Sequence, residues 1–284
     1  MRLDFDGAKE SPQSAPPMNT DHYISAVMAL KEARQITAFT GAGISAESGI
    51  PTFRDADGFW TRFPPDQYAN WKGLLQKSVT SPRSVAEFIL HVIEPIAKAQ
   101  PNAAHTALAK LQQKVSCEII TQNIDRLHQL AGSQTVHEVH GSIFEIVDTS
   151  TGELLKTFTH TELQDIAEQV KQYLLNDVSL PGLLLNLAHL YPWDWNISQR
   201  PNIVLFGDQL AEPDWSNAHQ AAEECDVLLK IGTSGVVYPA AMLPDVAQTA
   251  GAVVISIDPQ PSDGLWLKGK ASEVLPKLVE DAMA

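Results

Sequence analysis

The chain has 284 residues, a net charge of −14 at pH 7 and a pI near 5.0, which together exclude several classes of protein. The acidic balance argues against nucleic-acid binding, which needs a basic surface. No run approaches the roughly 18–20 apolar residues of a membrane span, and the N-terminus has no apolar signal core. We therefore expect a cytoplasmic or otherwise intracellular protein.

The N-terminal stretch and the cysteines carry little chemistry. Residues 1–20 are polar and contain Pro12, Pro16 and Pro17, so we expect a disordered extension. Cys117 and Cys225 are far apart and form no CxxC pair. Both adjoin apolar runs, which predicts buried structural thiols in a reducing compartment.

Five short apolar runs predict the strands of a parallel sheet buried on both faces. These runs are Gln35–Phe39, Ser116–Thr121, Asn202–Phe206, Asp226–Ile231 and Ala252–Ile257. Helical patterns lie between them at 82–98, 102–113, 124–131, 215–224, 238–249 and 271–282. The alternation predicts an α/β class with a doubly wound, Rossmann-like parallel sheet, whose ligands bind at the carboxyl ends of the strands.

Two long stretches interrupt this alternation, at 52–100 and 143–199. The second begins with a hairpin pattern, FEIVD and LLKTF around a turn at Thr149–Gly152. A helical pattern follows from Thr161, and Pro181-Gly182 is expected to break it. We expect the two insertions to pack together as a smaller lobe beside a Rossmann-like domain of 21–142 and 200–284.

A glycine-rich stretch, Gly41-Ala42-Gly43, follows the first predicted strand and begins like a dinucleotide-binding motif. Such glycines let backbone N–H groups approach a pyrophosphate at a helix N-terminus. A dehydrogenase would continue into a long helix, but Ser48-Gly49-Ile50-Pro51 ends this one after roughly two turns. These residues alone leave open a nucleotide site or a tight turn without a ligand.

Polar residues also stand where the second predicted strand ends. Gln122, Asn123 and Asp125 lie at a buried sheet edge, where polar groups are costly unless they bind something. A helix-capping role for Asn123 or Asp125 is the alternative. His140 precedes a glycine after a short β-like run, and a single histidine of this kind is as well explained by a structural role.

Five motifs in a fixed order decide between these interpretations. They are GAGIS…GIPTFRD, TQNID.LH..AG, HG, IVLFG and GTS..VYPAA. Over residues 22–145 and 200–282 the chain thereby resembles the sirtuin family of NAD-dependent protein-lysine deacylases. The resemblance implies that NAD is consumed and that nicotinamide, O-acyl-ADP-ribose and deacylated lysine are formed. It also explains the early helix end, since the sirtuin loop closes over the ribose and nicotinamide.

The resemblance implies a set of NAD-binding residues along the carboxyl edge of the sheet. Its members are Gly41, Ala42, Gly43, Ser45, Phe53, Arg54, Gln122, Asn123, Ile124, Asp125, Gly232, Thr233, Ser234 and Asp258. Within this set, Phe53 is expected to shield the reaction centre and Arg54 to order the loop. Ile124 and Asp125 are expected to hold the nicotinamide carboxamide.

The resemblance also implies the catalytic and substrate-binding residues. His140 is expected to be the general base, because an imidazole takes up a proton near neutral pH. Asn123 is expected to order a water molecule. The acylated peptide is expected to add as a strand between two segments. These segments consist of Phe206, Gly207 and Asp208, and of Gly235, Val236 and Val237.

The sequence departs from the family pattern in three places. Sirtuins usually hold a structural zinc on four cysteines, but no cysteine lies between 118 and 224, so we expect no metal site. Arg126 stands where many relatives have glycine. Two interpretations remain open: the side chain affects access to the nicotinamide or peptide site, or it is a solvated residue at the start of a helix. Ile89 and Val92 replace the Tyr-x-x-Arg pair that binds acidic acyl groups in one sirtuin branch. Arg62 or Arg83 could take over that role, but nothing in the sequence supports this. We therefore expect a preference for acetyl or longer apolar acyl groups.

Three other functions compete with deacylation. Protein ADP-ribosylation and plain NAD hydrolysis occur in sirtuin-like proteins, and an NAD sensor without activity is the third. The retained His140 favours deacylation, because ADP-ribosyl transfer requires no base on the ribose.

Overall fold

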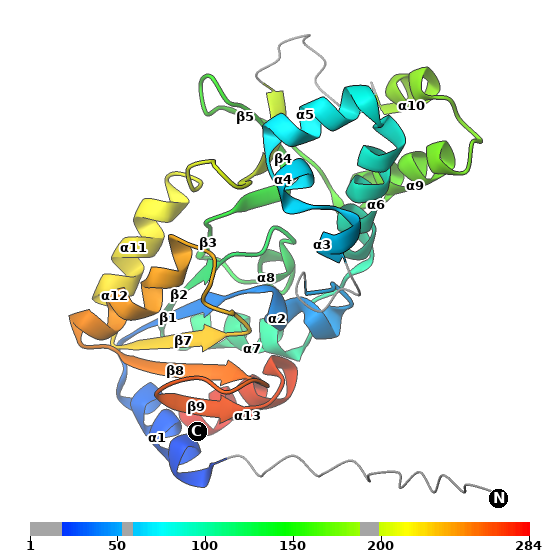
Figure 1. Cartoon of the computed structure of the whole chain (residues 1–284). Coiled ribbons are helices and arrows are strands. Elements are labelled where there is room, and N and C mark those ends of the chain that lie inside the picture. The colour runs from blue at the N-terminus through cyan, green and yellow to red at the C-terminus, as the bar shows by residue number, and fades with distance from the viewer. Residues whose placement is uncertain (1–18, 53–58, 188–198) are drawn as a thin grey trace, which may run out of the picture.

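The computed structural model describes residues 19–52, 59–187 and 199–284, and its centre is a six-stranded sheet (Figure 1). The strands lie in the order β3-β2-β1-β7-β8-β9, and every neighbouring pair is parallel. Their bounds are β1 Gln35–Thr40, β2 Ser116–Thr121, β3 Val136–Glu138, β7 Val227–Ile231, β8 Val253–Asp258 and β9 Leu265–Lys268. The chain winds outward from β1 in both directions, which confirms the predicted α/β fold class and creates a switch point between β1 and β7.

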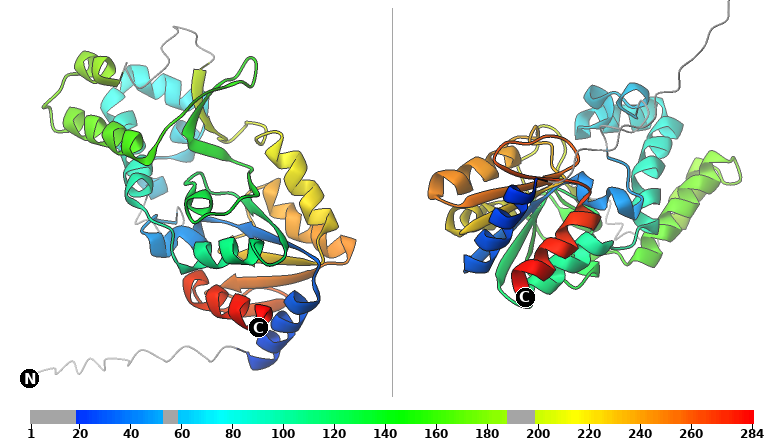
Figure 2. Two further views of the ribbon diagram at one scale, coloured as in Figure 1. Left: turned by 180° about the vertical axis from the view of Figure 1, so that it is seen from behind. Right: turned by 90° about the horizontal axis from the view of Figure 1, so that it is seen from below.

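Helices cover both faces of this sheet (Figures 1 and 2). On one face, α1 Thr20–Glu32, α7 Ala103–Gln112 and α13 Ala271–Met283 share an apolar cluster with the strands. On the other face, α11 Asp214–Glu224 and α12 Leu243–Ala250 form a second cluster. Burial on both sides explains why the central strands read as continuous apolar runs.

A second, smaller lobe contains a three-stranded sheet in the order β5-β4-β6, with both pairs antiparallel. Its strands are β4 Gly141–Asp148, β5 Leu154–Thr157 and β6 Gln199–Ile203. Its helices are α3 Phe59–Arg62, α4 Pro65–Tyr68, α5 Trp71–Thr80, α6 Pro82–Lys98, α9 His160–Leu174 and α10 Leu180–Leu187. Ile93 of α6 and Leu163 of α9 share one core with Phe144 and Ile146 of β4, so both insertions contribute to it.

Several sequence predictions need correction. The run Asn202–Phe206 is not a strand of the parallel sheet, because β6 pairs antiparallel with β4 and ends at Ile203. β3 corresponds to the short β-like run noted before His140, although it was not assigned to the parallel sheet, and β9 was missed, since strands of three and four residues give a short pattern. The helix expected at 124–131 is only α8 Leu127–Leu130. Pro181 and Gly182 do not break a helix, since they lie in the first turn of α10.

The early end of the first helix is confirmed. α2 Ala42–Ser45 continues as a 3-10 turn over Ala46–Ser48, and Gly49 then takes a φ of 88°, which favours glycine. No helix within the described ranges is long and apolar enough to cross a membrane.

Candidate active site

Three glycines bring the ends of β1 and β7 into backbone contact at the switch point. A Cβ on Gly43 would lie 2.6 Å from the Cα of Gly232, and one on Gly41 would lie 2.9 Å from the Gly232 carbonyl oxygen. The Gly43 N–H donates to that oxygen at 2.9 Å. The space between the loops admits no side chain, and the packing sets the N-terminus of α2, with Ala42, at the carboxyl edge of the sheet.

Behind this loop, Ser45, Asn123 and Asp125 form a polar cluster. Ser45 Oγ donates to Asp125 Oδ2 at 2.7 Å, and Asn123 Nδ2 donates to Ser45 Oγ and to the Gly41 carbonyl, both at 3.1 Å. Burial raises the pKa of Asp125, which is 3% exposed. Asp125 Oδ1 also accepts from the Leu127 N–H at 3.0 Å, but the N-cap of α8 is Arg126, so Asp125 is not the capping residue of that helix. Within the described residues Asn123 Oδ1 makes no hydrogen bond and can accept one from a ligand.

Two buried histidines that the sequence analysis missed support this cluster. His105 Nδ1 accepts from the Asn102 N–H at 3.3 Å, so Nε2 carries the proton and faces Ser45 Oγ at 3.5 Å. His128 packs against His105 and contacts Thr40 Oγ1 through Nε2 at 3.0 Å. Burial lowers the pKa of His105 to about 4 and the pKa of His128 well below its ordinary value. The signal in the sequence was PNAAH, a capping asparagine followed by a histidine on an apolar helix face.

His140 lies between β3 and β4, where the chain passes from the large sheet to the small one. Its Nδ1 is 2.9 Å from the Gln122 carbonyl oxygen. Because a carbonyl only accepts, Nδ1 carries the proton and the neutral ring keeps its lone pair on Nε2. Burial lowers the pKa of His140, and the Gln122 carbonyl raises it by less. The imidazole is therefore neutral at pH 7 and able to accept a proton.

The remaining predicted NAD residues lie at the ends of β2, β7 and β8. Gln122 Nε2 donates to Thr233 Oγ1 at 2.7 Å, which ties the end of β2 to that of β7. Ser234 is exposed beside it, and Asp258 ends β8. Phe53 and Arg54 lie outside the described residues. The structure thus brings most of the predicted set together along one edge, although contact with NAD stays a prediction for every member.

The predicted peptide-binding segments present exposed apolar side chains and free backbone groups. Phe206 is 61% exposed and Val236 is 58% exposed. In the part of the chain that the structure describes, the N–H groups of Gly207, Gly235 and Val236 have no hydrogen-bond partner. Asp208 has a structural task as well, because its Oδ2 accepts from Trp71 Nε1 at 2.8 Å and from Arg200 Nη1 at 3.0 Å.

The arginines considered as acid-binding substitutes have other partners. Arg62 Nη2 lies 2.9 Å from Glu87 Oε2, and Arg83 Nη1 donates to Asn176 Oδ1 at 2.5 Å. Arg126 is not a solvated helix-start residue, since its side chain is 23% exposed and forms ion pairs with Glu138 and Glu145.

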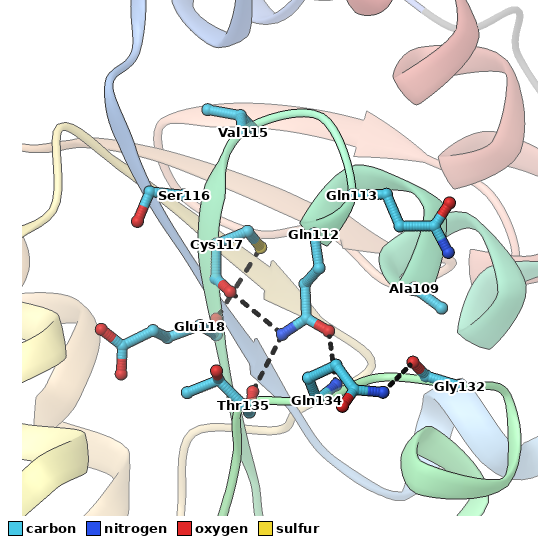
Figure 3. Close-up of a pocket in the computed structure, with 10 residues that line it drawn as sticks. All are labelled: Ala109, Gln112, Gln113, Val115, Ser116, Cys117, Glu118, Gly132, Gln134 and Thr135. Carbon is cyan, nitrogen blue, oxygen red and sulfur yellow. Dashed lines mark hydrogen bonds between the residues drawn. The ribbon is translucent and has the colours of Figure 1, made fainter.

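An open pocket elsewhere on the molecule does not belong to this site (Figure 3). It lies beside the start of β2, away from the carboxyl ends of the strands. Gln112 fills part of it, donating to the Cys117 and Thr135 carbonyls at 3.0 and 2.9 Å and accepting from the Gln134 N–H. Both polar atoms of the Gln112 amide therefore already have protein partners. Among the described residues, no group of three or more His, Cys, Asp or Glu side chains is arranged to hold a metal ion.

Comparisons with known proteins match this chain to one family. A model described as "Sir2 family" matches residues 41–239. The NAD-dependent protein deacylase of Pyrococcus furiosus is 40% identical over 258 residues, covering 89% of this chain and 94% of that protein. The protein of the same name from Thermococcus kodakarensis is 40% identical over 266 residues, covering 90% and 95%.

Solved structures give the same result. A Sir2 homologue in complex with NAD matches with a TM-score of 0.72 and 32% identity, over 91% of this chain and 93% of that one. A Sir2 protein bound to a myristoylated histone peptide matches with a TM-score of 0.66 and 31% identity, over 93% and 97%. With the family model spanning well over half of the sequence, the chain belongs to the Sir2 family, the sirtuins.

Proposed function

We propose that the chain is an NAD-dependent protein-lysine deacylase that forms nicotinamide, O-acyl-ADP-ribose and deacylated lysine. The observation that carries the proposal is His140, a partly buried, neutral imidazole with Nδ1 donating to the Gln122 carbonyl and Nε2 left to accept. The two relatives described above, both at 40% identity, are named NAD-dependent protein deacylases.

The switch point fits a dinucleotide. Its glycine loops pack without side chains between them, which lets α2 begin directly at the sheet edge where a pyrophosphate binds in this class of fold. Asn123 Oδ1 is available for the ribose or a water molecule, and Asp125 stands beside Ile124 for the carboxamide. NAD supplies the electrophilic ribose carbon and the nicotinamide leaving group.

His140 and its neighbours supply the proton chemistry. After nicotinamide has left, a ribose hydroxyl must lose a proton to attack the acyl carbon, and His140 Nε2 is the base that we assign to this step. The Gln122 carbonyl holds the ring tautomer, and Asn123 places a water molecule. Burial of the ring keeps it neutral, so it needs no prior deprotonation at pH 7.

For the acyl group, we propose acetyl or longer apolar chains and weak or absent desuccinylation. Ile89 and Val92 offer no charge partner to a carboxylate, while Arg62 and Arg83 are held by Glu87 and Asn176. A matched Sir2 protein is bound to a myristoylated histone peptide, which supports an apolar acyl chain as substrate here. Comparing turnover of acetyl-, myristoyl- and succinyl-lysine peptides tests this, and faster desuccinylation would refute it.

We further propose that the small lobe needs no zinc and that the protein acts in the cytoplasm. The lobe has an apolar core around Ile93, Phe144 and Ile146 that can hold its shape. Cys117 and Cys225 are separate buried thiols, as a reducing compartment favours. Metal analysis of the purified protein decides the first point: about one zinc per chain would contradict it.

One experiment separates deacylation from its alternatives. The chain is incubated with NAD and an acetyl-lysine peptide, and the products are identified by mass. O-acetyl-ADP-ribose supports deacylation, whereas ADP-ribosylated protein or free ADP-ribose alone supports the transferase or the hydrolase. His140→Ala should lower deacylation by about 10²- to 10⁴-fold, the usual contribution of a general base. Lys156→Gln, in the small lobe, is the control.

A further inference from the structure

Arg126 lies in an unusual conformation directly after Asp125. Its φ is 57°, in the left-handed region that glycine adopts readily, yet it carries a long charged side chain. The guanidinium is mostly buried and contacts two carboxylates on different sheets. Its Nε lies 3.6 Å from Glu138 Oε2, and its Nη2 donates to Glu145 Oε1.

These two carboxylates flank the candidate base. Glu138 ends β3 of the parallel sheet, and Glu145 lies in β4 of the small sheet, with His140 between them in the chain. Gly141, at the same crossing, has a φ of 71°, and a Cβ there would lie 2.0 Å from the Asn202 carbonyl oxygen. The turn that carries the histidine is therefore tightly packed against Asn202 of β6.

Further contacts tie this arrangement to the nucleotide edge. The Ile143 N–H donates to the Ile124 carbonyl at 3.2 Å, so β4 is hydrogen-bonded to the segment that carries Asp125. Asn202 Nδ2 donates to Glu145 Oε2 at 2.8 Å, which fixes the other oxygen of that carboxylate. We propose that Arg126 is a positioning residue for His140, holding the strands before and after the histidine together across the two lobes. The inference rests on the proposed function for its catalytic consequence.

The local charges indicate that Arg126 joins β3 and β4 through mostly buried contacts, rather than forming an exposed surface ion pair. Glu138, Glu145 and Asp214 all interact in this region, and Arg126 is a cation that offsets them, while Asp214 also lies 3.7 Å from His137 Nδ1. Burial raises the pKa of Glu138 to about 8, while Arg126 lowers it. A pKa of about 8 leaves the Glu138 carboxyl largely protonated at pH 7, so the charged partner of the guanidinium is Glu145. Without the guanidinium, Glu145 would be left as a mostly buried carboxylate lacking its cation, and the contacts that join β3 to β4 beside His140 would be lost.

The test uses Arg126→Gly, a charge swap and a matched control. Glycine suits the left-handed backbone, so the first variant removes the guanidinium without adding strain. The swap combines Arg126→Glu with Glu145→Arg and restores the pair in reverse. Lys156→Gln breaks the 3.0 Å ion pair with Glu162, which lies wholly within the small lobe. Each protein is assayed for deacetylation kcat and for exchange of labelled nicotinamide into NAD.

Nicotinamide leaves before the base acts, so misplacing His140 should affect the two activities unequally. We expect Arg126→Gly to lower deacetylation kcat by about 10- to 100-fold, the scale of a misplaced catalytic group, and to lower exchange much less. The swap should recover most of kcat, and Lys156→Gln should resemble the unmodified chain. Unchanged kcat in Arg126→Gly, an equal fall in both activities, or a folded swap variant that is as slow as Arg126→Gly would overturn the proposal.

A second readout does not depend on turnover. Histidine-labelled protein gives the pKa of His140 by NMR, and burial holds that pKa below its ordinary value. We expect the pKa of His140 to rise in Arg126→Gly as the ring gains solvent, and to return in the swap. No change in either would overturn the positioning role. If the unmodified chain consumes no NAD, the proposed function fails, while the NMR titration still decides whether Arg126 positions the ring.

Discussion

At the scale of single residues, the site depends on glycines that allow close backbone contact and on hydrogen bonds that fix the proton of a histidine ring. Gly41, Gly43 and Gly232 let two loops touch through backbone atoms. The Gln122 carbonyl oxygen fixes the tautomer of His140, and hydrogen bonds from Ser45 and the Leu127 N–H hold the Asp125 carboxylate in position. Small changes at these positions should therefore have large effects on activity.

Gly43→Ala should weaken NAD binding. The new Cβ would lie 2.6 Å from Gly232, and since the contact is with backbone, the loops must move apart. We expect at least a tenfold rise in the KM for NAD, equivalent to about 1.4 kcal/mol of lost binding. Gly152→Ala is the control, because that glycine has a φ of 74° but nothing within 4 Å. An unchanged KM in a folded Gly43→Ala protein would contradict the assigned loop.

The pH dependence of kcat/KM tests the assignment of His140. The base must be neutral to accept a proton, so activity is lost as pH falls through its pKa. Since burial lowers the pKa of His140, the acidic limb should lie below the ordinary value of about 6.5. A limb centred above that value, or one that persists in His140→Ala, would contradict the assignment.

At the scale of elements, the sequence predicted what long patterns encode. β1, β2, β7 and β8 are continuous apolar runs because helices cover both faces, and α6 was predicted with its observed bounds, Pro82–Lys98. The edge strands β3 and β9 are too short for an apolar pattern that would assign them to the sheet. β6 was assigned to the wrong sheet, since an apolar run does not say which partner it pairs with. His105 was missed because its partner Ser45, 60 positions away in the chain, meets it only in three dimensions, although its local partner Asn102 was visible in the sequence.

The capping box of α9 gives a prediction for the small lobe. Thr159 Oγ1 accepts from the Glu162 N–H at 3.2 Å, and Glu162 Oε2 accepts from the Thr159 N–H at 2.8 Å. Thr159→Ala should lower the free energy of unfolding by about 1 kcal/mol without changing the KM for NAD. Thr80→Ala removes an exposed hydroxyl bonded to its own helix and should change the free energy of unfolding by less than about 0.5 kcal/mol. Urea unfolding of both variants measures the difference, and equal effects would show that the cap contributes nothing.

At the scale of the whole molecule, two buried neutral histidines make stability depend on pH. Burial lowers the pKa of His105 to about 4, whereas the unfolded chain protonates it near its ordinary value of 6.5. Below that ordinary value the unfolded state binds more protons, so stability falls as pH falls from about 6.5 towards 4. At about 1.4 kcal/mol per pKa unit, protonation of His105 alone should lower the free energy of unfolding by about 3 kcal/mol over this pH range.

His105→Gln should flatten this acid dependence, because the amide can still donate to Ser45 but does not titrate. Urea unfolding at pH 7.5 and pH 5 measures the change in the free energy of unfolding. The control is His219→Gln, whose side chain is 43% exposed. A pH dependence that is the same in His105→Gln as in the unmodified chain would show that the buried histidine is not its source.

We expect the candidate active site to consume NAD by moving an acyl group from lysine to ribose. The most direct test follows a peptide whose acetyl group is isotopically labelled, with NAD present and the products separated by mass. We predict labelled O-acetyl-ADP-ribose, formed mole for mole with nicotinamide and with deacetylated peptide. Label recovered as free acetate while NAD stays intact, or nicotinamide released while the peptide keeps its acetyl group, would contradict it.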